Sequence, residues 1–380
     1  MQYRKLGKLG METSILGFGC MRLPTRDTST DSPDIDRVSF RALAQYALDE
    51  GINYFDTAYS YHSGQSEIAL GEIFSELPRK EVRLVTKMPI WMVKEQKDFD
   101  RFFHEQLSRL QTDYLDGYLL HNLTLETYRK LCTLGIREWL EAQKERGRIL
   151  FSGFSFHETP EAFKEIIDDW TGWDLCQVQY NYMNEDTQAG NQGVTYAHEK
   201  GLAVVVMEPL LGGNLAAPPQ SVCDIFEQAS KKWTPAEWAF SWLWNQPEIS
   251  TVLSGMNSMS QLQENISIAN HAEPGFLAKE EVTLIKKARD KFKSLWPISC
   301  TGCGYCLPCP SGVAIPRIFE LFNHAEVHSL FILNRNIYNA VVPPESRANM
   351  CQECGRCEER CPQGLSIISH LSRIHTYFTE

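Results

Sequence analysis

The chain has 380 residues, of which 43% are hydrophobic and 22% charged, and a formal net charge of −11 at pH 7. This length allows one large domain and one small domain, and the composition is that of a globular protein. The negative charge argues against nucleic acid or an acidic membrane as a partner, because both need a basic face. The N-terminal stretch MQYRKLGKLG lacks an apolar segment, and no apolar run could span a bilayer, so we expect a cytoplasmic protein.

Charge and cysteine content divide the chain into two parts. Residues 1–296 carry 31 Lys and Arg against 41 Asp and Glu, whereas residues 297–380 carry 6 against 7, with no Lys and no Asp. Eight of the 12 cysteines also lie in the second part. We therefore predict two domains, residues 1–296 and residues 297–380.

Short apolar runs alternate with longer amphipathic segments in the first part. The runs predict eight strands, at residues 14–20, 53–57, 82–87, 115–121, 149–155, 175–180, 203–208 and 249–254. Helical patterns lie at residues 36–50, 98–110, 125–146, 160–169, 188–200 and 235–245. Apolar runs separated by helices are typical of parallel strands buried on both faces. Eight such units predict an α/β fold, a (β/α)8 TIM barrel, with a doubly wound sheet as the alternative.

Most of the predicted strands end in a side chain that can take part in catalysis. These strand ends are Asp56, Lys87, His121, Ser155, Gln177 and Glu208. In a barrel of parallel strands, the carboxyl ends of the strands form the face that carries the active site. The sequence therefore predicts a site at that face.

Four motifs resemble those of the aldo-keto reductase family, and the resemblance covers almost all of residues 1–270. They are LGFGCMRLP (16–24), NYFDTAYSYHSGQSE (53–67), VTK (85–87) and DYLDGYLLH (113–121), and the short ENI (264–266) matches as well. The resemblance implies an oxidoreductase that reduces a carbonyl, or oxidises the alcohol, with hydride exchanged with NAD(H) or NADP(H). It places the catalytic set on Asp56, Tyr61, Lys87 and His121.

Elementary chemistry agrees with those four assignments. A carbonyl that accepts hydride needs a proton, and we expect Tyr61 to supply it as general acid. Lys87 would lower the pKa of the phenol from its usual value of about 10, and Asp56 would hold Lys87 in place. His121 would orient the carbonyl oxygen. Tyr59 and His62 are the alternative proton donors.

The resemblance also implies a nicotinamide dinucleotide site, which departs from the family pattern. Phe156 replaces the family's Asn, with His157 nearby, and Met207 replaces its stacking aromatic ring. Gly255 and Gln261 stand where many members carry Lys and Arg for the 2′-phosphate, so no preference for NADP(H) is supported. The full set of expected contacts is Ser155, Gln177, Met207, Pro209, Leu210, Gly212, Asn214, Gly255, Gln261, Glu264 and Asn265.

Two cysteine runs in the second part have the spacing of ferredoxins. The run Cys351-x2-Cys354-x2-Cys357-x3-Cys361-Pro362 is the bacterial ferredoxin pattern, and Cys300-x2-Cys303-x2-Cys306-x2-Cys309-Pro310 is one residue shorter. In that pattern the fourth cysteine binds the other cluster. We therefore expect two [4Fe–4S] clusters with crossed ligands, one held by Cys300, Cys303, Cys306 and Cys361, the other by Cys351, Cys354, Cys357 and Cys309.

Helical patterns at residues 315–325 and 327–338 separate the two runs, and the region resembles a small, mainly α-helical two-cluster ferredoxin domain. A single cluster, a zinc site and metal-free thiols are the alternatives.

Three functions remain open on the sequence alone. The first is a nicotinamide-dependent carbonyl reductase whose clusters are structural, redox-sensing or electron-transferring. The second is a reductase that receives electrons from a ferredoxin or flavoprotein through its clusters. The third is a non-catalytic, redox-sensing binding module. Tyr59, Trp91 and Phe156 suggest an aromatic-lined pocket for a small-molecule substrate.

Overall fold

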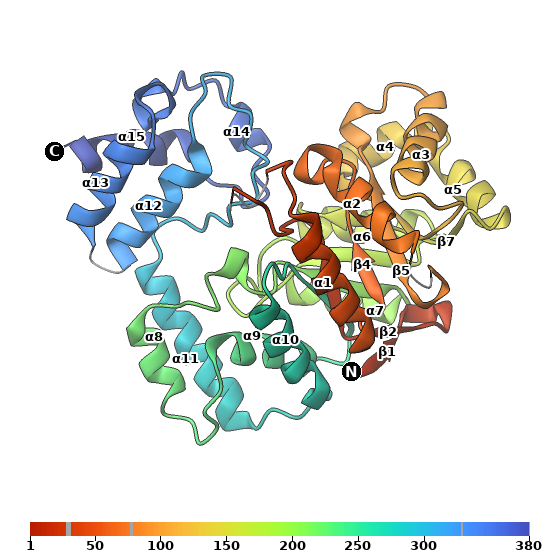
Figure 1. Ribbon diagram of the computed structural model, residues 1–380, viewed down its shortest axis with the longest axis horizontal. Helices are drawn as coiled ribbons and strands as arrows, with labels where there is room; N and C mark the ends of the chain where they lie inside the picture. The colour runs from red at the N-terminus through yellow and green to blue at the C-terminus, as the bar shows by residue number, and fades with distance from the viewer. Residues whose placement is uncertain (28–31, 77–78, 328–329, 380) are drawn as a thin grey trace. The chain divides into compact units, whose positions relative to one another are not determined.

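The computed structural model describes residues 1–27, 32–76, 79–327 and 330–379 (Figure 1). Packing groups the chain into two compact units, one of Met1–Pro209 with Glu237–Ala278 and one of Leu210–Ala236 with Lys279–Glu380. Packing alone does not show which segments fold independently, so the domain boundary after residue 296 stays a prediction. Within the described ranges, no helix is long and apolar enough to cross a membrane.

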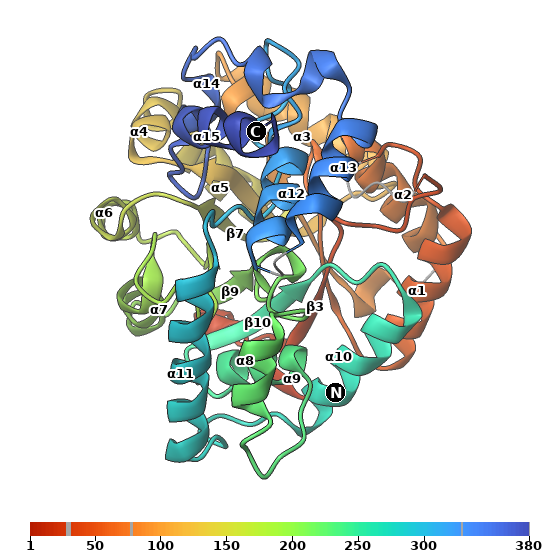
Figure 2. The same ribbon diagram turned by 90° about the vertical axis from the view of Figure 1, so that its left-hand side faces the viewer.

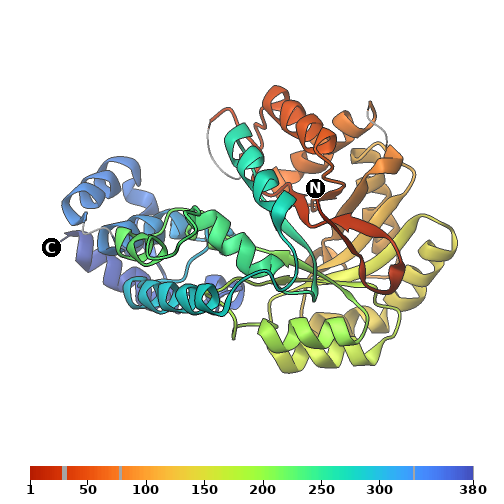
Figure 3. The ribbon, with the colours of Figure 1, turned by 90° about the horizontal axis from the view of Figure 1, so that it is seen from below.

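Eight parallel strands of the first unit close into a barrel in the order β10-β3-β4-β5-β6-β7-β8-β9 (Figure 3). The predicted (β/α)8 barrel is therefore confirmed, and the doubly wound alternative is wrong. Every predicted strand run coincides with one observed strand. The strands are β3 (Leu16–Gly19), β4 (Tyr54–Asp56), β5 (Arg83–Met88), β6 (Leu115–Leu123), β7 (Ile149–Phe156), β8 (Leu175–Gln179), β9 (Ala203–Met207) and β10 (Ile249–Ser254).

Helices follow the strands in the order expected of this fold. They are α1 (Arg37–Asp49), α2 (Gln65–Phe74), α3 (Lys97–Arg109), α4 (Leu125–Thr133), α5 (Ile136–Glu145), α6 (Pro160–Asp169), α7 (Gly190–Glu199), α9 (Pro235–Trp244) and α10 (Met259–His271). The pattern at residues 125–146 forms two helices, because Gly135 adopts a left-handed φ of 84° between them. The sequence predicted neither α2 nor α10. In α2, residues on several sides are buried and no clear amphipathic period appears.

The interior of the barrel is apolar, and its next layer toward the carboxyl ends of the strands is polar. A hairpin of β1 (Tyr3–Lys5) and β2 (Glu12–Ser14) contributes Leu6 to the apolar layer. Side chains two residues apart on a strand face the same way. Asp56, Lys87 and His121 therefore face the interior beyond the apolar layer. That layer consists of Leu6, Tyr54, Val85, Leu119, Phe151, Leu175, Ala203, Val205 and Leu253.

A buried polar network supports β5 from outside the barrel. Thr86 Oγ1 and Gln106 Nε2 each donate to Glu67 Oε1 at 2.6 Å, and Arg109 pairs with Glu67 Oε2 at 3.1 Å. Glu67 and Thr86 are both fully buried. Because Thr86 faces outward, its neighbour Lys87 faces inward. The network therefore fixes the orientation of the strand that carries Lys87.

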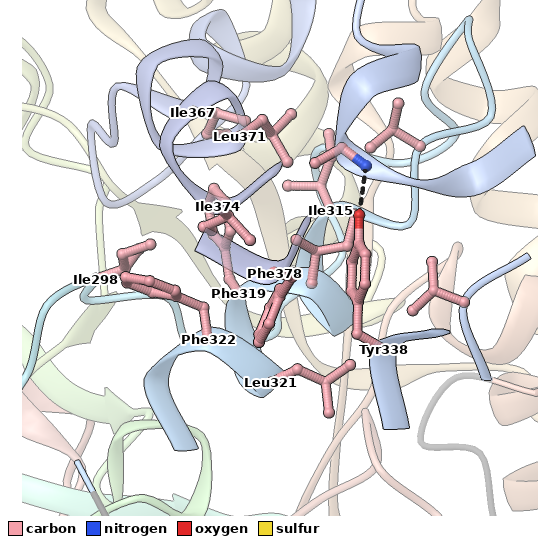
Figure 4. Close-up of a cluster of buried hydrophobic side chains, with 14 of the residues drawn as sticks. Ile298, Ile315, Phe319, Leu321, Phe322, Tyr338, Ile367, Leu371, Ile374 and Phe378 are labelled. Carbon is pink, nitrogen blue, oxygen red and sulfur yellow. Dashed lines mark hydrogen bonds between the residues drawn. The ribbon is translucent and has the colours of Figure 1, made fainter. Parts of the chain in front are cut away.

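The second unit is mainly α-helical. In it, α8 (Gln220–Phe226) lies beside α11 (Lys279–Leu295) (Figure 2). A separate apolar core forms where α12 (Ile315–Val327) packs against α13 (Phe331–Val341) and α15 (Ile367–Thr379). Figure 4 shows this core, in which the backbone N–H of Ala348 donates to Tyr338 Oη at 3.1 Å. This packing confirms the predicted small helical domain.

The close approach of α2 to the end of α3 yields a stability prediction. A Cβ added at Gly71 would lie 2.2 Å from the carbonyl oxygen of Arg109. Alanine is a better helix former than glycine by about 1 kcal/mol, so without this contact Gly71→Ala would stabilise the protein. We expect it instead to lower the free energy of unfolding by about 1–3 kcal/mol through overpacking. Urea unfolding monitored by circular dichroism tests this, and a raised unfolding midpoint would contradict it.

Candidate active site

A buried ion pair joins β4 to β5 at the carboxyl end of the barrel. Lys87 Nζ donates to Asp56 Oδ1 at 2.6 Å and to the carbonyl oxygen of Thr57 at 2.7 Å. The exposed fraction is 0% for Lys87 and 2% for Asp56. Burial lowers the pKa of Lys87, and the contact with Asp56 opposes that shift. The two charges are therefore held together in a site with little access to water.

Tyr61 and His121 complete the group of four predicted catalytic residues. Tyr61 begins a 3-10 turn (Tyr61–Gly64) after β4, and its Oη lies 3.4 Å from Lys87 Nζ. The ring of Tyr61 meets that of His121 edge to face, with centroids 5.8 Å apart. The structure therefore brings all four side chains together.

The proton affinities of Tyr61 and His121 suit a proton donor and a neutral hydrogen-bonding partner. Loss of solvation raises the pKa of Tyr61 well above its usual value, and the charge of Asp56 raises it further. Burial lowers the pKa of His121 well below its usual value, as does the neighbouring charge of Lys87. At neutral pH Tyr61 therefore carries its proton and His121 is uncharged. From the sequence we expected Lys87 to lower the pKa of Tyr61. In the structure that pKa is raised instead, because loss of solvation is the largest effect on the phenol.

The two alternative proton donors are held in other contacts. Tyr59 Oη donates to the carboxylate of Glu105 at 3.1 Å, and its ring lies under the Arg109 guanidinium. His62 Nε2 accepts the backbone N–H of Leu23 at 3.0 Å, so its Nδ1 is the donor to the Ser32 carbonyl at 2.7 Å. Both ring nitrogens of His62 are thus engaged. The resemblance assigned the proton donor to Tyr61, and the contacts made by its two neighbours agree with that prediction.

Part of the expected nicotinamide site lies at the ends of β7, β8 and β9. Ser155 Oγ accepts the backbone N–H of Asn122 at 2.7 Å. Gln177 Nε2 approaches Met207 Sδ at 3.9 Å. The buried Gln177 Oε1 has no hydrogen-bond partner among the described residues. An unpaired buried acceptor at this position fits the amide of a nicotinamide carboxamide.

Other expected nucleotide contacts lie around β10 and α10. Gln261 Oε1 accepts the backbone N–H of Asn257 at 3.1 Å, and Asn265 Nδ2 donates to Ser254 Oγ at 3.1 Å. Glu264 lies on the same helix, α10. Pro209 follows β9 in the first unit, whereas Leu210, Gly212 and Asn214 belong to the second unit.

Sequence reasoning missed Arg22, which lies beside Gly255. A Cβ added at Gly255 would be 3.4 Å from Arg22 Cβ. The charge of Arg22 also opposes the rise in the pKa of Tyr61. A cation therefore accompanies the glycine that replaces the family's lysine. The motif at residues 16–24 gave no signal for this contact, because it joins the segments that follow β3 and β10, which are far apart in the sequence.

The aromatic residues expected around the substrate are only partly in place. Trp91 is 51% exposed, and its ring centroid lies 5.2 Å from that of His121. Phe156 is fully buried and packs against Phe163 of α6, because it alternates with the inward-facing Ser155. Tyr59 is paired with Glu105, as described above. Of the three predicted aromatic residues, Trp91 alone lies against the catalytic group.

Cysteines from both runs line one cavity in the second unit. The cavity is bordered by Cys300, Cys303, Cys306 and Cys361, with apolar walls that include Phe319. Burial raises the pKa of Cys306, and so do the neighbouring thiols Cys303, Cys300 and Cys361. The four residues are those expected to hold the first cluster. A cavity lined by four thiols from two chain segments fits a [4Fe–4S] cluster.

The remaining four cysteines differ from one another in burial. Cys357 is buried beside Cys351, whose Sγ accepts the backbone N–H of Glu353 at 3.4 Å, while Cys354 is exposed. Cys309 packs against the helical core. In the part of the chain that the structure describes, no three His, Cys, Asp or Glu side chains converge closely enough for a single metal ion.

Comparison with known proteins agrees with this architecture. Residues 15–290 match the aldo/keto reductase family, and residues 299–366 match a 4Fe-4S dicluster domain. A probable aldo-keto reductase of Glycine max is 26% identical over 302 residues, covering 69% of this chain and 82% of that protein. L-galactose dehydrogenase of Arabidopsis thaliana is 26% identical over 319 residues, covering 78% and 97%.

A solved structure shows the same likeness in three dimensions. The holo form of an aldo-keto reductase from Bacillus halodurans superposes with a TM-score of 0.63 at 26% identity, covering 76% of this chain and 96% of that one. The chain is an oxidoreductase that joins this barrel to an iron–sulfur domain, and it belongs to the aldo/keto reductase family.

Proposed function

We propose that this protein is a carbonyl reductase that uses a nicotinamide cofactor at the carboxyl end of its barrel. The contact of Lys87 Nζ with both Asp56 and Tyr61 is the observation that carries the proposal. The bound nicotinamide would supply hydride to the carbonyl carbon. Ser155 and Gln177 would hold its carboxamide, and Met207 would pack on its ring.

The four polar side chains divide the remaining work. His121, uncharged at neutral pH, would donate a hydrogen bond that orients the carbonyl oxygen. Tyr61 would transfer its phenolic proton to that oxygen as negative charge develops on it. Lys87 would stabilise the resulting phenolate, and Asp56 would keep the ammonium in place. Oxidation of an alcohol would follow the same steps in reverse.

Removing the phenolic hydroxyl tests the role of Tyr61. We expect Tyr61→Phe to slow carbonyl reduction by at least about 100-fold, because the proton donor is lost while the ring remains. Tyr59→Phe is the matched control, since Tyr59 bonds Glu105 instead of Lys87, and should retain most of the activity. Steady-state rates with a panel of aldehydes, together with iron content, provide the measurement. Equal losses in the two variants would contradict the assignment.

The proton affinities predict the pH dependence of reduction. The pKa of Tyr61 is raised and that of His121 is lowered, so both groups keep their active protonation state between about pH 6.5 and 9. We expect the turnover number to be level across this window and to fall only at higher pH, as Tyr61 loses its proton. A fall centred below pH 8 would show that Lys87 lowers the tyrosine pKa after all.

We also propose that the second unit holds two [4Fe–4S] clusters with crossed ligands. The cavity that gathers Cys300, Cys303, Cys306 and Cys361 supports one ligand set. The other would be Cys351, Cys354, Cys357 and Cys309. Thiolates from two runs would then tie the segments that flank α12 and α13 to each other.

Metal counting in cysteine variants tests the crossed arrangement. Anaerobically purified protein should contain about eight iron and eight sulfide per chain, the content of two cubane clusters. Cys303→Ala and Cys361→Ala should each leave about four iron, and so should the double variant, because both residues serve one cluster. Cys223→Ser, outside both runs, is the control. Near-complete loss of iron in the double variant alone would indicate that each run holds its own cluster.

The exposure of Cys354 favours a second candidate function. A cluster near the surface could accept electrons from an external ferredoxin or flavoprotein, which would make the protein a cluster-fed reductase. Anaerobic assays with NADH or with a reduced ferredoxin as sole donor separate the two candidates. Substrate reduction that requires the ferredoxin would favour the second.

A further inference from the structure

The loop after β9 adopts an unusual backbone conformation. Leu211, Gly212 and Gly213 have φ values of 49°, 69° and 99°, all in the left-handed region. For Leu211, with its branched side chain, that region is unfavourable by about 1–2 kcal/mol. Such conformations persist only where surrounding contacts hold them. The loop therefore depends on what it packs against within the second unit.

A segment of the first cysteine run packs against this loop. A Cβ added at Gly212 would lie 2.4 Å from the carbonyl oxygen of Thr301 and 3.2 Å from its carbonyl carbon. Thr301 is 4% exposed and Leu211 is 2% exposed, whereas Gly212 itself lies at the surface, so the contact sits at the edge of a buried patch. Thr301 lies between Cys300 and Cys303, two of the four cysteines that line the cavity. Glycine at 212 is what permits this approach.

The segment that carries these two cysteines has little structure of its own. Residues 299–304 form no helix or strand. A cluster bound by Cys300 and Cys303 would fix the backbone on either side of Thr301, because each thiolate is tied to iron. Thr301 would in turn keep Gly212 and its neighbours in their left-handed conformation. The irregular cysteine segment and the short 3-10 turn at Leu211–Gly213 therefore support each other.

We propose that occupancy of the cluster at Cys300, Cys303, Cys306 and Cys361 controls the affinity of the protein for its nicotinamide nucleotide through the Gly212–Thr301 contact. This inference rests on the proposed function, in which Leu210, Gly212 and Asn214 contact the nucleotide. Within the second unit, the conformation of this loop would decide how Leu210, Gly212 and Asn214 are presented to the nucleotide. The coupling needs no electron transfer to the nucleotide.

Binding measurements with and without the cluster test the coupling. NADH should bind the anaerobic holoprotein more tightly than the Cys303→Ala variant, by a factor in the usual range for coupled sites, about 5- to 150-fold. Because the loop contacts the segment between Cys300 and Cys303, we also expect saturating NADH to change the electron paramagnetic resonance spectrum of the reduced cluster. Circular dichroism checks that the variant stays folded. Equal NADH affinities would overturn the coupling alone, whereas no binding to either protein would overturn the nucleotide site as well.

A second variant tests the contact itself with the cluster ligands intact. Gly212→Ala places a methyl group against the Thr301 carbonyl, and we expect it to weaken NADH binding at least fivefold and to abolish the spectral response to NADH. Gly275→Ala is the matched control, because Gly275 has a similar φ of 73° but no neighbour within 4 Å of the added Cβ. Wild-type NADH affinity in a Gly212→Ala protein with full iron content would overturn the proposal.

Discussion

The buried ion pair between Lys87 and Asp56 is the interaction on which the barrel site depends. Removing two charges from water costs several kcal/mol per ion, and only close, well-oriented contacts offset that cost. The parallel register supplies them, because Asp56 on β4 is paired with Val85 on β5, two residues before Lys87. A shift of one residue would turn Lys87 to the outer face of the barrel. The site therefore requires this strand register, because the register brings the ammonium group of Lys87 to the carboxylate of Asp56.

The same alternation of side chains links the site to the helices outside the barrel. Thr86 points outward to Glu67, and this places Lys87 inward. Ser155 points inward toward the expected nicotinamide site, and this turns Phe156 outward against α6. Substitutions on the outer face of a strand can thus alter catalysis without touching the substrate. The departures of the expected nicotinamide site from the family pattern, at Phe156, Met207, Gly255 and Gln261, leave the ion pair unchanged.

The two units offer different kinds of chemistry. Hydride moves as an electron pair, whereas an iron–sulfur cluster transfers single electrons, and a flavin would ordinarily mediate between them. The inferred link through Gly212 and Thr301 requires no such mediator, because it couples two binding events through backbone conformation. If the proposed link holds, cluster occupancy would affect nucleotide binding whether or not electrons pass from the clusters to the nucleotide.

The sequence by itself determined the strand runs, the polar residues at their ends and the spacing of the cysteines, because each of these is a local pattern. It predicted the barrel and the helical iron–sulfur domain for that reason. The tertiary structure alone decided that Tyr61 reaches Lys87 while Tyr59 and His62 turn to other partners, since three residues so close in sequence differ only in direction. It alone placed Arg22 beside Gly255 and Gly212 against Thr301. Those contacts join segments far apart in the chain, and such pairings follow from the way strands and helices pack, not from any local pattern.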